Sequence, residues 1–479
     1  MKKIFLAMIL LLAFVVRLYR LDFPLADWHS WRQADTAAVS RNFVKYGIDL
    51  LHPRFDDLSN VASGKENPQG YRFVEFPIYN VIHALVYKMF PFWSLETWGR
   101  LVSILFSLMS LIFLFLITEN FLNTQIALLA AFFFAVLPFN IYYSRVILPE
   151  PMMVMTSLGM IYFSLKTLNN YELRIADLIL SIIFGGMSFL LKPYSLVFLL
   201  PISYLGWRKW HFNYLKWIGF FLFFFISLIP FFWWRWWMSH YPQGIPAYDW
   251  LFNEGGIRFK GAWFYWLFAD RLGRLILGYW GIPMFVLGLI SKTNKKEGLF
   301  FYSWLGAILT YFVIIAGGNV RHDYYQVIAV PIICIFLAKG SYFLLTAPVQ
   351  YFQKIVCHLS FVICLFFLFA FSWYYVRDFF NINNPAIVEA GKAADRLLPS
   401  EAIVIAPYGG DTSFLYQTNR KGWPIGVEIE KFIKNGAEYY INIDIDDPEV
   451  EWLTEKYCVI QKTNEWVIID LKKHCIFQQ

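Results

Sequence analysis

The feature that most constrains this chain is a series of long apolar runs separated by charged connections. Several runs are long enough to cross the roughly 30 Å hydrocarbon layer of a bilayer at about 1.5 Å per residue. The pattern predicts a polytopic α-helical membrane protein with about eleven spans and additional interfacial helices. The expected spans are 4–16, 98–118, 126–143, 151–167, 175–191, 193–206, 215–234, 273–290, 299–316, 326–346 and 355–374.

Composition agrees with a membrane protein. Of 479 residues, 58% are apolar and only 16% are charged, whereas about a quarter of the residues in a soluble domain are charged. The net charge of +7 arises from basic residues that lie between the apolar runs and form no single patch, which argues against nucleic acid as a partner. The five cysteines include no CxxC pair, which argues against a metal knuckle.

The basic residues also predict which way the chain threads the membrane. Lys2 and Lys3 precede the first run, and Arg17 and Arg20 occupy the place of a small-residue cleavage site, so we expect an uncleaved span with a cytoplasmic N-terminus. Alternate threading then puts most other basic connections on the cytoplasmic side. The connections 21–97, 144–150, 235–272 and 317–325, and everything after residue 375, fall outside.

One apolar stretch, 76–92, disturbs this threading if it crosses. It is short and carries His83 and Lys88, so we expect a helix that lies along the membrane surface. If it crossed instead, the downstream positive-inside pattern would be inverted. The aromatic anchors of the expected surface helix would be Phe76, Tyr79 and Phe90.

The C-terminal part has the composition of a small soluble α/β domain. We expect helices at 386–398 and 449–456, strands at 402–406 and 439–443, and a hairpin formed by 458–461 and 466–470. The predicted domains are therefore a membrane domain, 1–375, with a first outer loop at 21–97, and an extracytoplasmic domain, 376–479. If this domain lies outside, Cys458 and Cys475 are able to oxidise together.

The first outer loop carries a dense group of ionisable side chains between Asp27 and Thr36. His29, Arg32 and Asp35 lie there among tryptophans that exclude water. On a helix, Arg32 would be one turn from Asp35 and would keep this carboxylate ionised, as a general base requires. The alternative is a capping and salt-bridging cluster at an interfacial helix.

A second connection places Glu150 between two prolines at the mouth of a span, five residues after Arg145. A carboxylate beside hydrocarbon is costly unless it has a partner or a task. The alternative to a functional role is that Glu150 stabilises the positive N-terminus of the following helix.

A third connection contains Arg321, His322, Asp323 and the pair Tyr324 and Tyr325. Guanidinium and protonated imidazole groups suit a phosphate ligand. Asp323 has the alternative role of ion-pair partner for Arg321. Lys192, at the outer end of its span, would either add a cation or extend to water.

These stretches resemble the GT-C class of membrane glycosyltransferases, particularly bacterial relatives of protein O-mannosyltransferases and of lipid A aminoarabinose transferase. The resemblance covers roughly residues 1–345, and its motifs are short. The matching stretches are Asp35–Phe43, Glu75–Tyr79, Ser144–Pro151 and His322–Tyr325.

The resemblance implies an enzyme that moves a sugar from a polyprenyl-phosphate donor to an acceptor hydroxyl with inversion, in a prokaryotic plasma (inner) membrane. Asp35 would be the catalytic base, and Glu150 would position the acceptor or hold Arg145. Many relatives carry two adjacent acids where this chain has Asp35 and Thr36, so we expect no obligatory metal. The donor phosphate would be bound by Arg321, His322, Lys192, Tyr324 and Tyr325, and the site would be supported by His29, Arg32, Arg145 and Glu75.

Three other functions remain open from the sequence. A transporter or flippase of a lipid-linked saccharide would have internal repeats and charges within the bundle, and neither is visible. A polysaccharide polymerase or ligase would share the donor chemistry. A sensor would depend on residues 381–479 and not on Asp35. The sugar and the acceptor, whether protein, lipid or envelope glycan, are not indicated by any motif.

Overall fold

The computed structural model describes residues 1–169, 174–347 and 350–475, and it divides the chain into two compact units. The helical unit contains Met1–Leu21, Arg100–Arg235 and Tyr248–Asp378. The sheet unit contains Asp22–Gly99, Trp236–Ala247 and Phe379–Gln479. The predicted division at residue 376 stays a prediction, and the compact units differ from it because the first loop packs with the C-terminal segment.

The helices of the helical unit follow the apolar runs closely. Four helical stretches among the described residues are long and apolar enough to cross a membrane, namely Leu95–Phe121, Tyr214–Met238, Asp323–Thr346 and Gln353–Leu397. Because other apolar helices are shorter, the number of eleven spans stays a prediction. The α-helices are α1 (Lys2–Arg17), α4 (Leu95–Phe121), α5 (Thr124–Val136), α6 (Pro138–Tyr143), α7 (Glu150–Asn169), α8 (Ile175–Leu191), α9 (Leu199–Trp210), α10 (Tyr214–Met238), α11 (Gly261–Phe264), α12 (Ile282–Ile290), α13 (Phe300–Ile314), α14 (Ala316–Arg321), α15 (Val330–Thr346) and α16 (Tyr351–Val376).

Short helices of other types connect them. The π-helix η5 covers Tyr265–Ile276. The 3-10 helices are η1 (Pro193–Phe198), η2 (Pro242–Gly244), η3 (Asp249–Leu251), η4 (Glu254–Phe259), η6 (Asp323–Ala329) and η7 (Arg377–Phe380).

The expected continuous span at 273–290 is wrong. The chain there forms the end of η5, a turn, and then α12. Gly278 has a positive φ of 50°, and a Cβ added to it would lie 2.5 Å from the carbonyl oxygen of Leu368 on α16. The turn therefore needs a glycine both for its backbone conformation and for its close approach to α16.

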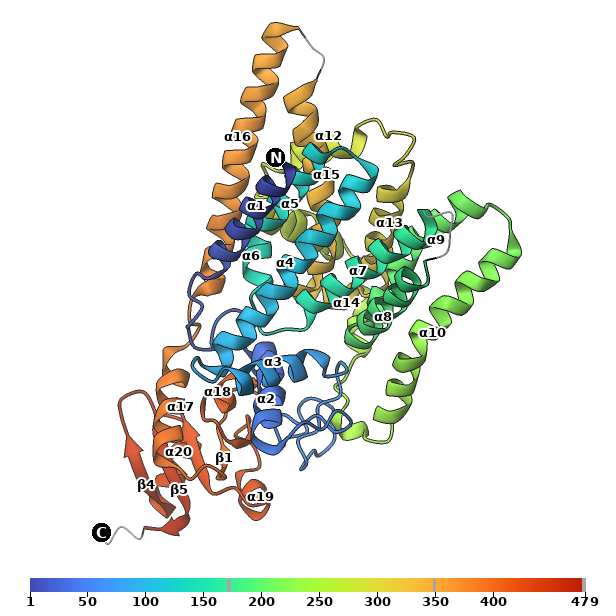
Figure 1. The fold of residues 1–479 in the computed structure, drawn as a ribbon. Helices are drawn as coiled ribbons and strands as arrows, with labels where there is room; N and C mark the ends of the chain where they lie inside the picture. The colour runs from blue at the N-terminus through green and yellow to red at the C-terminus, as the bar shows by residue number, and fades with distance from the viewer. Residues whose placement is uncertain (170–173, 348–349, 476–479) are drawn as a thin grey trace. The chain divides into compact units, whose positions relative to one another are not determined.

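Glycines also bring α12 and α15 into backbone contact. A Cβ at Gly288 would lie 1.9 Å from the Phe336 carbonyl oxygen, and one at Gly340 would lie 1.8 Å from that of Met284. Small residues of this kind let helices approach closely in a membrane. Close packing matters there because lipid is as apolar as the helix surface, so apolar burial alone does not drive helices together. Figure 1 shows α12 beside α15, and α7 beside α8.

The sheet unit contains a mixed five-stranded sheet of order β2-β1-β3-β5-β4. β1 is parallel to β2 and β3, while β5 is antiparallel to β3 and β4. The predicted strands, hairpin and two long helices are confirmed; the elements of three or six residues in 412–434 were missed because they are too short to show a period. The elements are α17 (Pro385–Leu397), β1 (Ile403–Ile405), α18 (Thr412–Gln417), β2 (Lys421–Trp423), α19 (Ile429–Lys434), β3 (Tyr439–Asn442), α20 (Pro448–Lys456), β4 (Tyr457–Lys462) and β5 (Val467–His474).

Alternation along the strands builds a core on each face of this sheet. Val404 and Ile441 pack with α17 on one face, while Ile405 and Tyr440 pack with α19 and α20 on the other. β1, β3 and β5 each contribute to both cores because successive side chains point to opposite faces.

The first loop joins the same unit through α2 (Ser30–Tyr46), α3 (Ile78–Met89) and an extended segment. The amide of Leu58 donates to Gly422 (2.9 Å), and the amide of Gly422 donates to Asp56 (3.0 Å), so the loop continues the sheet beside β2. α3 is about 18 Å long at 1.5 Å per residue, shorter than a bilayer core. Tyr79 is not a membrane anchor, because it is fully buried and donates to the Gly99 carbonyl.

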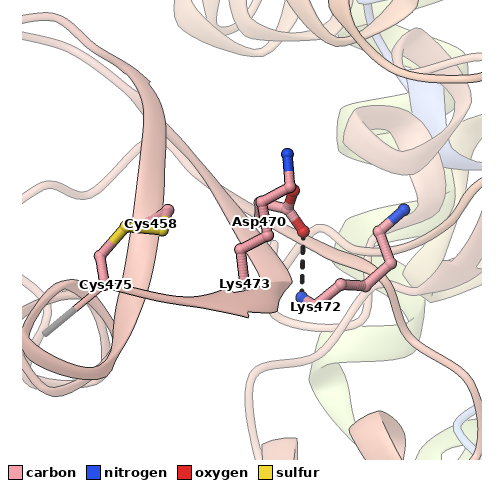
Figure 2. Close-up of a disulfide and its surroundings, with 5 residues drawn as sticks. All are labelled: Cys458, Asp470, Lys472, Lys473 and Cys475. Atoms are coloured by element: carbon pink, nitrogen blue, oxygen red, sulfur yellow. Dashed lines mark hydrogen bonds and ion pairs between the residues drawn. A yellow bond between two sulfur atoms is a disulfide. The ribbon is translucent and has the colours of Figure 1, made fainter.

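A disulfide closes the hairpin at the end of the chain. Figure 2 shows that Cys458 on β4 is bonded to Cys475, directly after β5. The carboxylate of Asp470 accepts a hydrogen bond from the backbone amide of Lys472 at 3.0 Å beside it. The pairing of Cys458 with Cys475 that the sequence allowed is thus confirmed.

Candidate functional site

Asp35 lies on α2 in the sheet unit and is buried, with 3% of the residue exposed. Arg72 Nη2 donates to Oδ2 at 2.5 Å, and the Thr412 hydroxyl donates to Oδ1 at 2.7 Å. Arg72 comes from the first loop, whereas Thr412 comes from α18, 377 residues after Asp35 in the chain. A guanidinium and a hydroxyl together stabilise its charged form.

The expected pairing of Arg32 with Asp35 is replaced by a different arrangement. Arg32 Nη2 donates to both carboxylate oxygens of Glu75, at 2.8 and 2.9 Å, and Nη1 donates to the Thr36 hydroxyl. Both members of the Arg32–Glu75 pair are buried. The two residues predicted to support the site are therefore brought together, but Arg72 is the residue that pairs with Asp35.

Further acidic groups surround the Asp35–Arg72 pair. The pKa of Asp57 is raised to about 6, chiefly by burial and further by the charge of Asp35, while Ser59 and Arg72 act in the opposite sense. Burial and Asp35 likewise raise the pKa of Asp411, the residue that precedes Thr412. Asp57 therefore takes up a proton as the pH falls through about 6.

His29 immediately precedes α2 and adopts a left-handed backbone conformation with φ of 55°. Its ring lies 5.1 Å from that of Trp28, which in turn stacks on Phe379 at 4.9 Å. This conformation starts the helix that carries Asp35, and the predicted supporting role of His29 stays a prediction.

Glu150 begins α7 in the helical unit and is 1% exposed. Lys192 Nζ, at the end of α8, lies 2.8 Å from Glu150 Oε1, although the contact lacks the angles of a hydrogen bond. Within the described part of the chain, neither carboxylate oxygen of Glu150 accepts a hydrogen bond. A buried charge normally has such partners, so Glu150 has capacity to accept donors from a ligand.

The partner of Glu150 differs from the one expected. Arg145 donates through Nη1 to the Tyr19 carbonyl at 2.6 Å and through Nη2 to the Arg20 carbonyl at 2.9 Å. Arg145 therefore fixes the chain after α1, and Lys192 pairs with Glu150. Lys192 does not extend to water, because it is only 6% exposed.

Two tyrosines near this pair, Tyr194 and Tyr311, were not predicted from the sequence. Tyr194 follows Lys192 by two residues, and its ring lies 4.9 Å from Tyr311 and 6.0 Å from Tyr325. Glu150 is an electrostatic neighbour of Tyr194 and Tyr311. The Tyr194 hydroxyl is buried and bonds to no described residue. The sequence offered only the Lys192-Pro-Tyr194 spacing as a signal.

The third predicted connection forms an aromatic cluster with an exposed arginine. Arg321, at the end of α14, forms an ion pair with Glu254 and lies 5.4 Å from the Trp250 ring. His322 lies 5.4 Å from Trp250 and 5.4 Å from Tyr324. Stacking continues from Tyr324 to Tyr325 at 4.8 Å.

Asp323 is not the ion-pair partner of Arg321 in the arrangement found. Arg321 pairs with Glu254, and Asp323 accepts a hydrogen bond from the Tyr143 hydroxyl. Asp323 therefore links η6 to the end of α6, which fixes the backbone on which His322 and Tyr324 lie.

The residues around Asp35 do not fit a divalent metal. Hard cations need several oxygen ligands, whereas a guanidinium and a hydroxyl donate to the Asp35 oxygens. In the ranges that the structure describes, no three His, Cys, Asp or Glu side chains are grouped to hold a metal ion. Metal independence stays a prediction.

The chain is similar to known proteins both in part of its sequence and in its fold. Residues 75–237 match the family described as dolichyl-phosphate-mannose-protein mannosyltransferase. The crystal structure of ArnT from Cupriavidus metallidurans bound to undecaprenyl phosphate is 14% identical, with a TM-score of 0.66 over 97% of both chains. In the apo state the same protein is 12% identical, with a TM-score of 0.68 and the same coverage.

A more distant structure is also similar. The Archaeoglobus fulgidus oligosaccharyltransferase in complex with Zn and sulfate is 10% identical, with a TM-score of 0.60 over 92% of this chain and 68% of its own. No curated protein matches in sequence. The predicted resemblance is confirmed at this level: residues 75–237 match the mannosyltransferase family, and the chain has the fold of ArnT.

Proposed function

We propose that this protein is an inverting glycosyltransferase that moves a sugar from a polyprenyl-phosphate donor to an acceptor hydroxyl on the outer face of the plasma membrane. The fold supports this function, and ArnT, which shares the fold, was solved with undecaprenyl phosphate bound. The observation that carries the proposal is the setting of Asp35, a buried carboxylate that accepts hydrogen bonds from Arg72 and Thr412.

Asp35 retains capacity to accept a further proton donor. A carboxylate has about four lone-pair sites, and within the described residues two side chains donate to this one. An acceptor hydroxyl would bind as a third donor. Burial keeps water from competing for the same sites and strengthens the interaction.

In the proposed reaction, the acceptor oxygen forms a bond to the anomeric carbon while its proton passes to Asp35. The bond between the anomeric carbon and the phosphate oxygen breaks, and its electron pair leaves with polyprenyl phosphate. The anomeric centre is inverted, and Asp35 later gives its proton to water.

Arg321, His322 and Lys192, with the tyrosines beside them, are the proposed ligands of the donor phosphate. The pair of Arg321 and Glu254 is half exposed, with exposed fractions of 51% and 54%, so it is weak and a phosphate can replace the carboxylate. Contacts that strengthen as charge develops on the leaving phosphate would each contribute about 2–4 kcal/mol.

Glu150 is proposed to bind donor groups of the acceptor or sugar. Its oxygens accept no hydrogen bond from the described residues, and the Tyr194 hydroxyl beside it is similarly unused. A polyhydroxyl ligand can satisfy both, because each sugar hydroxyl is a donor and an acceptor.

The disulfide supports the proposed sidedness of the C-terminal segment. Cys458 and Cys475 are bonded, and disulfides persist mainly in oxidising compartments outside the cytoplasm. An outer location for the sheet unit would also place Asp35 outside, since Asp35 belongs to this unit.

The test is donor turnover by the purified full-length protein. A panel of undecaprenyl-phosphate-linked hexoses, pentoses and amino sugars, labelled in the sugar, is supplied, and release of label is followed for the wild type, Asp35→Asn and Asp49→Asn. Asp49 is an exposed acid that pairs with His52, so it controls for removal of a charge. A parallel series with chelator tests metal independence.

Turnover of one donor that falls by about 10²–10⁴-fold in Asp35→Asn, as expected for loss of a general base, with donor binding and Asp49→Asn unaffected, supports the proposal. Undiminished turnover in Asp35→Asn would remove Asp35 from the catalytic role. Donor binding without turnover, with or without acceptor extracts, would favour a transporter instead.

A further inference from the structure

We infer that Thr412 is a positioning residue for the base: its hydroxyl turns to hydrogen-bond Asp35 both before and after Asp35 has taken a proton. This inference rests on the proposed function. It assigns part of the acid–base centre to the C-terminal segment, which the sequence analysis placed in a separate domain.

The position of the Thr412 hydroxyl is fixed by the helix on which it lies. Thr412 is the first residue of α18, and the Asp411 side chain caps this helix by accepting from the Ser413 amide at 2.7 Å. At the other end of α18, Gln417 Nε2 donates to the Leu25 carbonyl at 2.8 Å. The cap fixes the first turn of α18, and the Gln417 contact holds its last turn to the first loop.

Tyr416 adds a further attachment of α18 to the N-terminal part of the sheet unit. Its hydroxyl donates to Glu96 at 2.5 Å, and its carbonyl accepts from Arg41 Nη1 at 3.0 Å. The Arg41 guanidinium also lies 4.0 Å from the Tyr416 ring. These buried contacts restrict movement of α18, so Thr412 keeps its distance to Asp35.

The Thr412 hydroxyl has two acceptors and only one proton. Asp35 Oδ1 lies 2.7 Å from Oγ1, and the Trp31 carbonyl oxygen lies 3.2 Å from it. While Asp35 is charged, the hydroxyl donates to it, because the carboxylate is the stronger acceptor. Rotation about the Cβ–Oγ bond is enough to redirect the proton to Trp31.

This geometry accommodates the proton that Asp35 receives in the proposed reaction. Once Oδ1 is protonated, it becomes the donor, Thr412 Oγ1 accepts, and the threonine proton turns to the Trp31 carbonyl. No heavy atom has to move and no bond is lost. Arg72 cannot respond in this way, because a guanidinium has donors only.

The charged groups around Asp35 cannot stabilise both of its protonation states, whereas a neutral hydroxyl can hydrogen-bond to either one. Arg72 favours the charged carboxylate, while Asp57 and Asp411 are its acidic neighbours. Each of these groups favours one protonation state of Asp35 through its charge. Thr412 is the hydroxyl that can serve both states.

The experiment compares Thr412→Val, Thr412→Ser and Thr418→Val in the full-length protein. Valine has nearly the shape of threonine without the hydroxyl, and serine restores the hydroxyl. Thr418 follows the same helix and is fully buried, but its hydroxyl donates to Leu415 at 2.7 Å and not to Asp35. Turnover of the undecaprenyl-phosphate sugar used by the wild type is measured from pH 5 to 9.

We expect Thr412→Val to lower kcat about tenfold or more, in line with loss of a hydrogen bond to a charged group, with little change in the KM for donor. The acidic limb of its pH profile should move to higher pH, because the charged carboxylate has lost a donor. Thr412→Ser should keep the wild-type profile, and so should Thr418→Val.

Equal kcat and equal pH profiles for Thr412→Val and the wild type would overturn the inference, as would equal loss in the valine and serine variants. These results leave the proposed function intact if Asp35→Asn is inactive. Active Asp35→Asn, or no donor turnover by the wild type, would instead overturn the proposed function together with this inference.

Discussion

Asp35 in the sheet unit and Glu150 in the helical unit are equally hidden carboxylates with opposite surroundings. Asp35 is 3% exposed and Glu150 is 1% exposed. Asp35 accepts hydrogen bonds from a guanidinium and a hydroxyl, whereas Glu150 lies beside one ammonium group and accepts no hydrogen bond from the described residues.

The difference separates two ways of keeping a charge in a protein interior. The donors of Asp35 are in place before any ligand binds, which suits a base that must be ionised in advance. The Glu150–Lys192 pair balances charge but leaves lone pairs unused, which suits a group that binds ligand hydroxyls. Burial alone would not distinguish these roles.

The largest expected effect tests whether the Glu150–Lys192 pair is only structural. Glu150→Gln should destabilise the protein by about 3–5 kcal/mol, because it removes the carboxylate that faces the buried ammonium group of Lys192. The double variant Glu150→Gln/Lys192→Met should recover most of this stability, measured by thermal unfolding in detergent. Both variants should remain poor in turnover; restored turnover in the double variant would make the pair a structural feature only.

The next prediction concerns the excess of acid around Asp35. The pKa of Asp57 is about 6 in the folded protein against an ordinary value of 3.8, so the folded state binds the proton more tightly. Stability should therefore fall as pH rises from about 4 to about 6, by roughly 3 kcal/mol from this group.

Asp57→Asn removes that dependence. The variant should be more stable than the wild type at pH 7.5, and the difference should disappear by pH 4. The Ser59 amide, which donates to Asp57 at 2.7 Å, still has an amide oxygen to bond. A difference that is constant across this pH range would contradict the assigned cause, and Asp49→Asn provides an exposed acid as control.

Loss of Arg72 should lower the free energy of unfolding by less than loss of Glu150 does. Arg72→Met removes a buried partner, but Thr412 continues to donate to Asp35, so we expect about 2 kcal/mol of destabilisation. Unfolding of Arg72→Met and Glu150→Gln is measured side by side. A cost for Arg72→Met that exceeds the cost for Glu150→Gln would break the proposed distinction.

The smallest expected effect is at the exposed end of the helical-unit site. Arg321→Ala should raise the KM for donor about tenfold, equivalent to about 1.4 kcal/mol, and leave stability nearly unchanged because its ion pair is exposed. Arg377, which is 50% exposed and lies 4.0 Å from Asp378, is the matched control. Equal effects of Arg321→Ala and Arg377→Ala on KM would remove Arg321 from phosphate binding.

Much of the fold was predictable because its signals are local. Long apolar runs located most helices of the helical unit, and short apolar runs located the strands around Ile403 and Tyr439. The exception at 273–290 depends on the close approach of Gly278 to Leu368. No pattern within the run itself reveals a neighbouring helix.

The acidic residues of the candidate site, Asp35 and Glu150, could be predicted from the sequence. The residues that pair with them could not. Spacing favoured Arg32 for Asp35 and Arg145 for Glu150, because a sequence displays only near neighbours. The actual partners, Arg72 and Lys192, are brought in by tertiary packing. Thr412 had no signal at all, because a threonine 377 residues away looks like any other.

That separation has a consequence for biosynthesis. At about 5–20 residues per second, Thr412 leaves the ribosome roughly 20–75 s after Asp35, when the helices up to α16 have already been made. The nascent chain therefore carries its base without its hydroxyl partner until the last segment folds. A truncated or stalled chain lacks the complete centre, so unfinished copies in the membrane would not consume donor lipid at the full rate.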